Sequence, residues 1–412
     1  MIIRARAVVT MDGPPIENGA VAVSGNRIID VGKFPEISAR HSGQQLVDLG
    51  EQVMLPGLIN AHCHLDYTCL RDQIPPKKSF ADWIRAINAE KARLSARDYV
   101  AAIAEGFAEA KRFGTTTIAN LTAFPELISR IHAPIRTWWF AELIDVRSPE
   151  RADELVDLAV ESLKPAANWG LAPHALFTAS ANLYRRCEEV AHRDHMLLTT
   201  HLAESREEMS MFHDGAGPLY DFMRSIGRPM DDCGHETPLR LFSESIGAPL
   251  STSLRTDSWG ALPTEWIVAH LNELAESDFE LLEAFRGKFH VVHSPRSHDY
   301  FAPSAFAFKR LRDLGFNICL GTDSLASNEN LSLFAEMRAF RRSEPAVSPK
   351  EALEMVTVNG GQALGRPQIL GRIRANYFAD LIAIPCSGIT DVFEEILAFD
   401  QPVHWIMVNG KT

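Results

Sequence analysis

Eight short apolar stretches recur along the middle of this 412-residue chain, and a pattern with helical periodicity follows most of them. The stretches are Leu55–His62, Thr115–Asn120, Ile135–Glu142, Trp169–His174, Met196–Leu202, Glu265–Leu271, Phe289–Ser294 and Phe316–Thr322. Helical periodicity is plainest over residues 98–113 and 151–164. Strands that alternate with helices form a parallel sheet, and eight repeats fit a closed barrel. We therefore expect an α/β protein with a (β/α)8 TIM barrel.

The two ends of the chain carry a different pattern, in which apolar and polar positions alternate between turn residues. Residues 20–23 and 27–32 flank Ser24-Gly25-Asn26, which predicts a β-hairpin. Strand patterns return over residues 379–384 and 403–410. We expect residues 1–54 and 368–412 to form one β-domain around a barrel of residues 55–367.

The longest connection spans residues 205–264, between the fifth and sixth predicted strands. Connections of this length in a compact domain commonly serve as lids or binding loops. A segment that contacts another subunit explains the length equally well. The sequence leaves both interpretations open. The second would make the protein a homo-oligomer.

Charge and composition exclude several partners. The chain has 41 basic and 53 acidic residues, a net charge of −12, which argues against nucleic acid or an anionic membrane as a partner. No apolar run is long enough to span a bilayer, and the apolar start is too short for a signal peptide. The six cysteines lack pairing spacing, so we expect reduced thiols and a cytoplasmic protein.

Metal-ligating residue types stand at the ends of three predicted strands. His62 and His64 are one pleat apart and share a face, whereas Cys63 points the other way. His201 ends the fifth strand and Asp323 follows the eighth. Each of these residues alone is better explained as structural, but barrel enzymes build their sites at the carboxyl ends of strands. Together they predict a metal site with an open position for water.

Four motifs in order along the chain resemble the amidohydrolase superfamily, and within it the metal-dependent deaminases of amino-heterocycles. They are Pro56-Gly57 followed by His62-Cys63-His64, the HLAE segment from His201 to Glu204, Val268-Ala269-His270, and Gly321-Thr322-Asp323-Ser324. The resemblance implies that the terminal β-domain is a composite β-sandwich. Two-metal subgroups carry a bridging lysine at the end of strand four, and residues 170–174 contain none. We therefore expect one divalent metal ion per chain, zinc first and iron(II) as the alternative.

The resemblance also assigns catalytic roles. Glu204 corresponds to the residue that carries a proton between water and the ring nitrogen. His270 corresponds to the histidine that orients the attacking water, and Asp323 to a metal ligand that also accepts a proton from it. A helix-start glutamate is an equally good explanation of Glu204 taken alone.

Substrate contacts are inferred from weaker matches to adenosine-type deaminases. His174 lies in a PH-x-x-x-T-x-S segment, and Trp83 lies in a segment after strand one that resembles the family's loop over the ligand. The same resemblance implies that Glu90 could reach a ribose hydroxyl. Ser324 follows the eighth strand, and His298 stands where the family usually has asparagine, which leaves that face in doubt. Trp83 is explained equally well as helix core.

The sequence thus predicts a hydrolase of carbon–nitrogen bonds outside peptides, a cyclic amidine deaminase. The expected substrates are small heterocycles of the adenine-nucleoside type, such as S-adenosylhomocysteine, methylthioadenosine or aminodeoxyfutalosine. Triazine chlorohydrolases, guanine or cytosine deaminases and cyclic-amide hydrolases remain alternatives. A metal-free assembly scaffold is the alternative outside enzymes, and it is disfavoured because the ligand positions and Glu204 are intact. The cytidine-deaminase signature, the P-loop and H-E-x-x-H are absent from the sequence.

Overall fold

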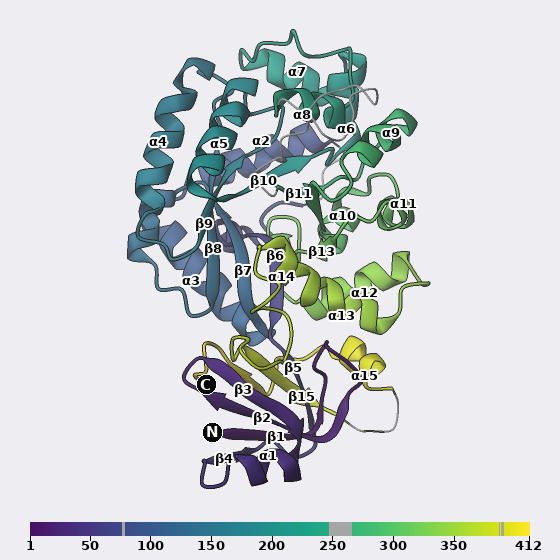
Figure 1. Ribbon diagram of the computed structural model, residues 1–412. Coiled ribbons are helices and arrows are strands. Elements are labelled where there is room, and N and C mark those ends of the chain that lie inside the picture. The colour runs from purple at the N-terminus through teal and green to yellow at the C-terminus, as the bar shows by residue number, and fades with distance from the viewer. Residues whose placement is uncertain (76–78, 247–265, 387, 389–390) are drawn as a thin grey trace.

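The computed structural model describes residues 1–75, 79–246, 266–386, 388 and 391–412 of the chain (Figure 1). Its larger part is a parallel sheet of nine strands in the order β13-β12-β11-β10-β9-β8-β7-β6-β14. The strands are β6 (Leu58–His64), β7 (Thr115–Thr122), β8 (Arg136–Leu143), β9 (Trp169–Pro173), β10 (Leu197–Leu202), β11 (Trp266–His270), β12 (Phe289–His293), β13 (Ile318–Leu320) and β14 (Asp323–Ser324). Consecutive strands from β6 to β13 are neighbours, so the predicted TIM-barrel-like α/β fold is confirmed.

The sheet curls until its last segment meets its first. β13 pairs with β12, whereas β14, only two residues further on, pairs with β6. The Gly321 N–H donates to the His293 carbonyl at 3.0 Å, and the Thr322 N–H donates to the His62 carbonyl at 3.1 Å. A Cβ atom on Gly321 would lie 2.7 Å from the His62 carbonyl oxygen, so the close approach requires glycine. The predicted strand Phe316–Thr322 is therefore wrong in its bounds, because only Ile318–Leu320 forms β13 and the pairing with β6 is made just beyond the segment, by β14.

The first predicted strand, Leu55–His62, also divides into two elements. Residues 52–56 form β5 (Gln52–Pro56) in the terminal sheet, and β6 begins only at Leu58. Gly57 lies between them, and its N–H donates to the Asp380 carbonyl at 2.9 Å. A Cβ atom there would lie 2.1 Å from Thr116 Oγ1, so the chain crosses from one sheet to the other where only glycine fits.

Helices surround the barrel, as Figure 1 shows. The predicted helices over 98–113 and 151–164 are α3 (Ala96–Arg112) and α4 (Ala152–Leu163). The others in this part are α2 (Phe80–Lys91), α5 (Ala181–Asp194), α6 (Arg206–Met209), α7 (Pro218–Ser225), α8 (Pro238–Ser245), α9 (Glu276–Ala284), α10 (Pro295–Phe301), α11 (Phe308–Asp313), α12 (Leu333–Ser343), α13 (Pro349–Met355) and α14 (Val358–Ala363), with the short turns η1 (Leu65–Leu70), η2 (Pro125–Arg130), η3 (Pro149–Arg151) and η4 (Ser210–Asp214). None of the described helices combines the length and the apolar character that a membrane-crossing segment needs.

Strands from both ends of the chain form one separate sheet, shown below the barrel in Figure 1. It contains β1 (Ile2–Val8), β2 (Ile16–Ser24), β3 (Arg27–Lys33), β4 (Leu46–Asp48), β5, β15 (Leu381–Pro385) and β16 (Trp405–Met407), with α1 (Phe34–Arg40) and α15 (Val392–Ala398) nearby in the chain. β2 and β3 pair antiparallel through the predicted hairpin. The described strands here make a single seven-stranded sheet, so the β-sandwich stays a prediction.

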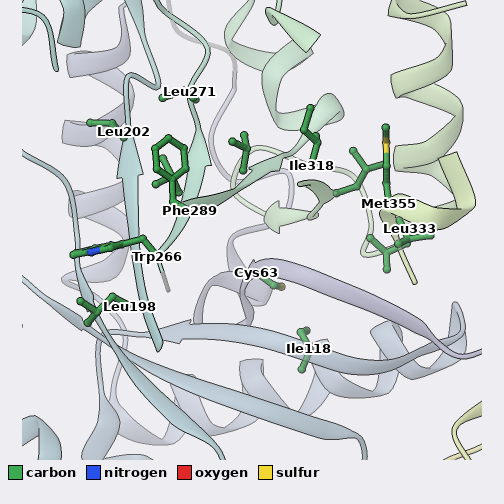
Figure 2. Packing of buried hydrophobic residues seen from close by; sticks show 14 of the residues in the cluster. Cys63, Ile118, Leu198, Leu202, Trp266, Leu271, Phe289, Ile318, Leu333 and Met355 are labelled. Carbon is green, nitrogen blue, oxygen red and sulfur yellow. The ribbon is translucent and has the colours of Figure 1, made fainter. Parts of the chain in front are cut away.

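The main hydrophobic core packs the barrel against its helices (Figure 2). Cys63, Ile118 and Leu198 belong to this core, and all three side chains are fully buried. Cys63 therefore packs away from the two histidines that flank it, as the strand pattern predicted. The alternation of β6 leaves His62 and His64 free for the candidate site.

Candidate active site

The predicted metal ligands converge on one point at the carboxyl ends of the strands. The Nε2 atoms of His64 and His201 lie 3.0 Å apart. The Nε2 atoms of His62 and His64 each lie 3.8 Å from Asp323 Oδ1. β6, β10 and β14 deliver these four side chains, so residues far apart in sequence share one cluster.

Hydrogen bonding and burial around the cluster leave histidine ring nitrogens unprotonated and available to a metal ion. His201 Nδ1 donates to the His174 carbonyl at 2.9 Å, which leaves Nε2 without a proton when the ring is neutral. Both ring nitrogens of His62 are buried and have no hydrogen-bond partner among the described residues. Burial holds the pKa of His62 and of His64 well below the usual histidine range, so both rings are neutral, as a ligand must be. The nitrogen and oxygen donors therefore suit a divalent metal ion.

Asp323 is oriented by two neighbours. The Ser297 hydroxyl donates to Asp323 Oδ2 at 2.6 Å, and the Ser324 N–H donates to Oδ1 at 2.8 Å. Asp323 itself has a φ of +56°, in the left-handed region. Strained backbone of this kind is concentrated at functional sites. Ser297 is a contact that the sequence reasoning missed, although it is the residue next to the predicted His298.

Glu204 and His270 lie beside the metal-ligand cluster. Glu204 Oε1 is 3.8 Å from His270 Nε2, and Glu204, His270 and Asp323 place one polar atom each within 4.8 Å of one another. Burial, with Asp323 as the next cause, raises the pKa of Glu204 well above its usual range. Burial lowers the pKa of His270, which keeps its ring neutral. A protonated carboxyl beside a neutral imidazole can donate and accept protons near neutral pH.

A pocket opens over this cluster and has one apolar wall. Its inner surface includes His64, His201, Glu204, Asp323 and Ser324, and the space within it measures about 720 Å³ including the mouth. The apolar wall is formed by Phe80, Trp83, Ile84, Ile87, Ile144 and Phe177. Aromatic and aliphatic walls around a few convergent polar groups are typical of small-molecule sites.

Three of the predicted substrate residues line the pocket, namely Trp83, His174 and Ser324. Trp83 also packs in the hydrophobic core, stacked on Phe80 with ring centroids 5.9 Å apart. Trp83 therefore lies both in the pocket wall, as the substrate prediction requires, and against the hydrophobic core, as the alternative predicted. His174 Nδ1 lies 2.6 Å from the Thr178 hydroxyl, which fixes the ring at the pocket wall.

Glu90 and His298 are not among the residues that line this pocket. Glu90 lies on α2, and its carboxylate pairs with Arg93 at 2.9 Å. The helix turns its neighbours Asn88 and Lys91 into the pocket instead, so the predicted contact of Glu90 with a ribose hydroxyl has no support in the pocket lining. His298 lies on α10 beside His293, with ring centroids 5.0 Å apart.

Glu142 is a pocket residue that sequence reasoning missed. It is the penultimate residue of β8, and its Oε1 lies 3.7 Å from His64 Nδ1. That oxygen is buried without a hydrogen-bond partner among the described residues. Burial raises the pKa of Glu142. Lys91 was also missed, and its Nζ donates to the Tyr67 hydroxyl at 2.8 Å. The position of Glu142 at a strand end was the one signal available for it.

The connection over residues 205–264 is described only up to residue 246. Its helix α7 contacts α2, which carries part of the pocket wall, and the Arg85 guanidinium lies 4.5 Å from the Phe222 ring centroid. Within the described part, residues 218–225 form α7. The rest of the connection, residues 247–265, lies outside the described residues, so the choice between lid and subunit contact stays open.

Comparisons with known proteins agree with this geometry. Residues 53–412 match the model of the amidohydrolase family. A 5-methylthioadenosine/S-adenosylhomocysteine deaminase of Syntrophobacter fumaroxidans is 29% identical over 393 residues, which cover 90% of this chain and 81% of that protein. A protein of the same name from Pyrococcus furiosus is 26% identical over 403 residues, 93% of this chain and 86% of that one.

Solved structures share the fold over the whole chain. The aminofutalosine deaminase of Helicobacter pylori has a TM-score of 0.84 at 21% identity, covering 100% of this chain and 99% of that one. A zinc-bound adenosine deaminase of Xanthomonas campestris has a TM-score of 0.81 at 23% identity, covering 100% and 92%. Since the family model spans nearly the entire sequence, this chain belongs to the amidohydrolase family.

Proposed function

We propose that this protein is a metal-dependent hydrolytic deaminase of an amino-substituted nitrogen heterocycle. The observation that carries the proposal is the position of Glu204, a buried carboxyl 3.8 Å from His270 and beside the cluster of metal-ligating side chains. Replacing an amino group by oxygen requires a nucleophilic water and a proton donor to the ring. The site supplies groups for both tasks within one small space.

His62, His64, His201 and Asp323 would hold one divalent ion, and zinc fits their nitrogen and oxygen donors. Such an ion lowers the pKa of bound water and so supplies a nucleophile near neutral pH. His270 orients the attacking water, and Asp323 accepts its proton. Glu204 donates a proton to the ring nitrogen next to the reacting carbon as the water oxygen adds to that carbon. The proton held by Asp323 then passes to the amino group, which leaves as ammonia, and the hydroxyl proton of the adduct returns to Glu204 as the ring carbonyl forms.

An adenine-type nucleoside is the proposed substrate. The aromatic wall of Phe80, Trp83 and Phe177 suits a flat heterocycle, and the polar groups of the cluster lie at its inner end. Relatives that align over about nine-tenths of this chain are named as deaminases of 5-methylthioadenosine and S-adenosylhomocysteine. Methylthioadenosine, S-adenosylhomocysteine and aminodeoxyfutalosine form the substrate class to test first.

A second part of the proposal concerns how the chain is divided into domains. We infer that residues 1–54 and 368–412 form a composite β-sandwich domain, and that residues 55–367 form a barrel domain. Support comes from the pairing of β5 with both β1 and β15, which joins the two ends of the chain.

An ammonia-release screen over purine, pyrimidine and triazine compounds tests the function. We expect release from adenine nucleosides, and a Glu204→Gln variant slower by roughly 10²–10⁴-fold with unchanged metal content. The matched control is Glu90→Gln, since Glu90 lies on the pocket helix but pairs with Arg93 away from the pocket. Chloride release from triazines without ammonia release from nucleosides would contradict the proposal, as would a Glu204→Gln variant with normal turnover.

A further inference from the structure

Glu208 is a fully buried carboxylate one turn beyond Glu204. Its Oε1 accepts the Ala203 N–H at 3.2 Å, and its Oε2 accepts the Glu204 N–H at 2.7 Å. Among the described residues, no ion pair involves Glu208. A buried carboxylate without a cation is costly unless hydrogen bonds compensate it, so these two amide contacts are the main support of its charge.

The backbone that Glu208 contacts does not follow an ordinary strand. Ala203 has a φ of +51°, in the left-handed region that costs energy for any residue except glycine. This turn comes directly after β10, between the metal ligand His201 and Glu204. The two amide groups point toward the same carboxylate only because the chain turns here.

A second residue holds the other side of the Glu204 peptide unit. Asn272 Nδ2 donates to the Glu204 carbonyl at 3.0 Å, and the Asn272 N–H donates to the Ala203 carbonyl at 2.9 Å. The backbone of Glu204 is thus bonded at its N–H by Glu208 and at its carbonyl by Asn272. The Glu204 side chain extends from this hydrogen-bonded backbone, and its Oε1 lies 3.8 Å from His270 Nε2.

Helix capping does not explain the arrangement. α6 (Arg206–Met209) has only four residues, and its own cap is Ser205, whose hydroxyl accepts the Glu208 N–H at 3.2 Å. The Glu208 carboxylate points back to the amides that precede the helix. Its contacts therefore serve the turn that carries Glu204.

We propose that Glu208 is a positioning residue, which holds Glu204 where it transfers protons. This inference rests on the proposed deaminase function. Among the described residues, Glu208 does not line the pocket and makes no hydrogen bond or ion pair with a predicted metal ligand, so it acts only through Glu204. Loss of one of its two acceptor oxygens should misplace Glu204 without emptying the metal site.

The first test is Glu208→Gln, which leaves one acceptor oxygen and sets an amide NH2 group against the other backbone N–H. We expect kcat for ammonia release from an adenine nucleoside to fall by roughly tenfold to 10²-fold, the scale of a misplaced catalytic group. KM and metal content per chain should stay within about twofold of the wild type, since the pocket wall and the ligands are untouched.

A double variant separates positioning from general loss of stability. If Glu208 acts only through Glu204, Glu204→Gln/Glu208→Gln should be no slower than Glu204→Gln alone. If Glu208 had a structural role independent of Glu204, the fold-decreases in kcat caused by the two substitutions would multiply in the double variant. The matched control is Glu188→Gln, because Glu188 is also a largely buried carboxylate and accepts the Trp266 Nε1–H at 2.8 Å, on the far side of the barrel wall. We expect normal kcat from that control.

Glu208→Asp serves as the second variant if Glu208→Gln is insoluble, since it retains the charge and shortens the reach by one methylene group. The same loss of kcat and the same non-additivity are expected. Normal kcat in a folded Glu208 variant, or multiplied losses in the double variant, would overturn the inference while Glu204→Gln still supports the deaminase. A wild-type protein inactive on every nucleoside would overturn the proposed function and this inference together.

Discussion

The barrel and the terminal sheet are joined by a buried ion pair whose loss should have a recognisable pH dependence. Arg136, the first residue of β8, donates from Nε and Nη2 to Asp380 Oδ2 at 3.1 and 3.0 Å. The side chains of Arg136 and Asp380 are 11% and 6% exposed. Asp380 Oδ1 also accepts the Asn409 N–H at 2.6 Å, so one carboxylate connects three segments.

Arg136→Met removes the cation and leaves the carboxylate buried. Breaking a buried pair from one side costs about 3–5 kcal/mol of the free energy of unfolding. Burial already raises the pKa of Asp380 although Arg136 opposes it, so without Arg136 this pKa should rise further. A carboxyl with a raised folded pKa binds a proton more tightly when folded. The variant should therefore be least impaired near the ordinary aspartate pKa of about 3.9 and lose stability as the pH rises through the folded pKa.

Asp380→Asn breaks the same pair from the other side and should behave differently. The Arg136 guanidinium stays charged at every accessible pH, so it has no proton to release and no way to lower its burial cost. We expect a loss of about 3–5 kcal/mol that is nearly constant with pH.

The assay is urea unfolding of both variants and the wild type at pH 5, 6, 7 and 8, followed by circular dichroism. Arg93→Met is the matched control, because the Arg93–Glu90 pair is exposed, with Arg93 72% exposed, and should be worth less than about 1 kcal/mol. A loss below about 1 kcal/mol in Arg136→Met, or the same pH dependence in the two Arg136–Asp380 variants, would refute the reasoning.

Three further predictions concern the metal, the pocket and the architecture. Purified protein should contain close to one divalent ion per chain, and His201→Ala should lose metal and activity together; metal analysis showing two ions would contradict this. Trp83→Ala should raise KM by about tenfold, since a base stacked on an aromatic ring is worth about 1–3 kcal/mol, with kcat less affected; an unchanged KM would assign Trp83 to the core alone. Removal of residues 1–50 should give insoluble protein, because β5 loses its partner β1 and apolar surface is exposed; a soluble, active truncation would contradict the architecture.

The pattern of the sequence determined the class of fold and the centre of the candidate site. Short, nearly continuous apolar stretches between helical patterns identified eight barrel segments, because a parallel strand that is buried on both faces requires apolar residues at successive positions. The ligand positions followed from one rule, that the carboxyl ends of parallel strands meet at one rim. This rule assigned four side chains to one site although the first and the last are 261 positions apart, at 62 and 323. They are His62, His64, His201 and Asp323.

Only the tertiary structure decided which side chains face the pocket and where two backbone segments approach closely. Glu90 is turned away from the pocket because the phase of α2 presents Asn88 and Lys91 instead, and a helix has no face until it is packed. The split at Gly57 arises from its approach to Thr116, a residue on another strand. Glu142 carries no motif of its own, and only the assembled barrel places it beside His64. Local patterns determine which elements form, whereas the contacts between residues distant in sequence exist only once those elements are packed together.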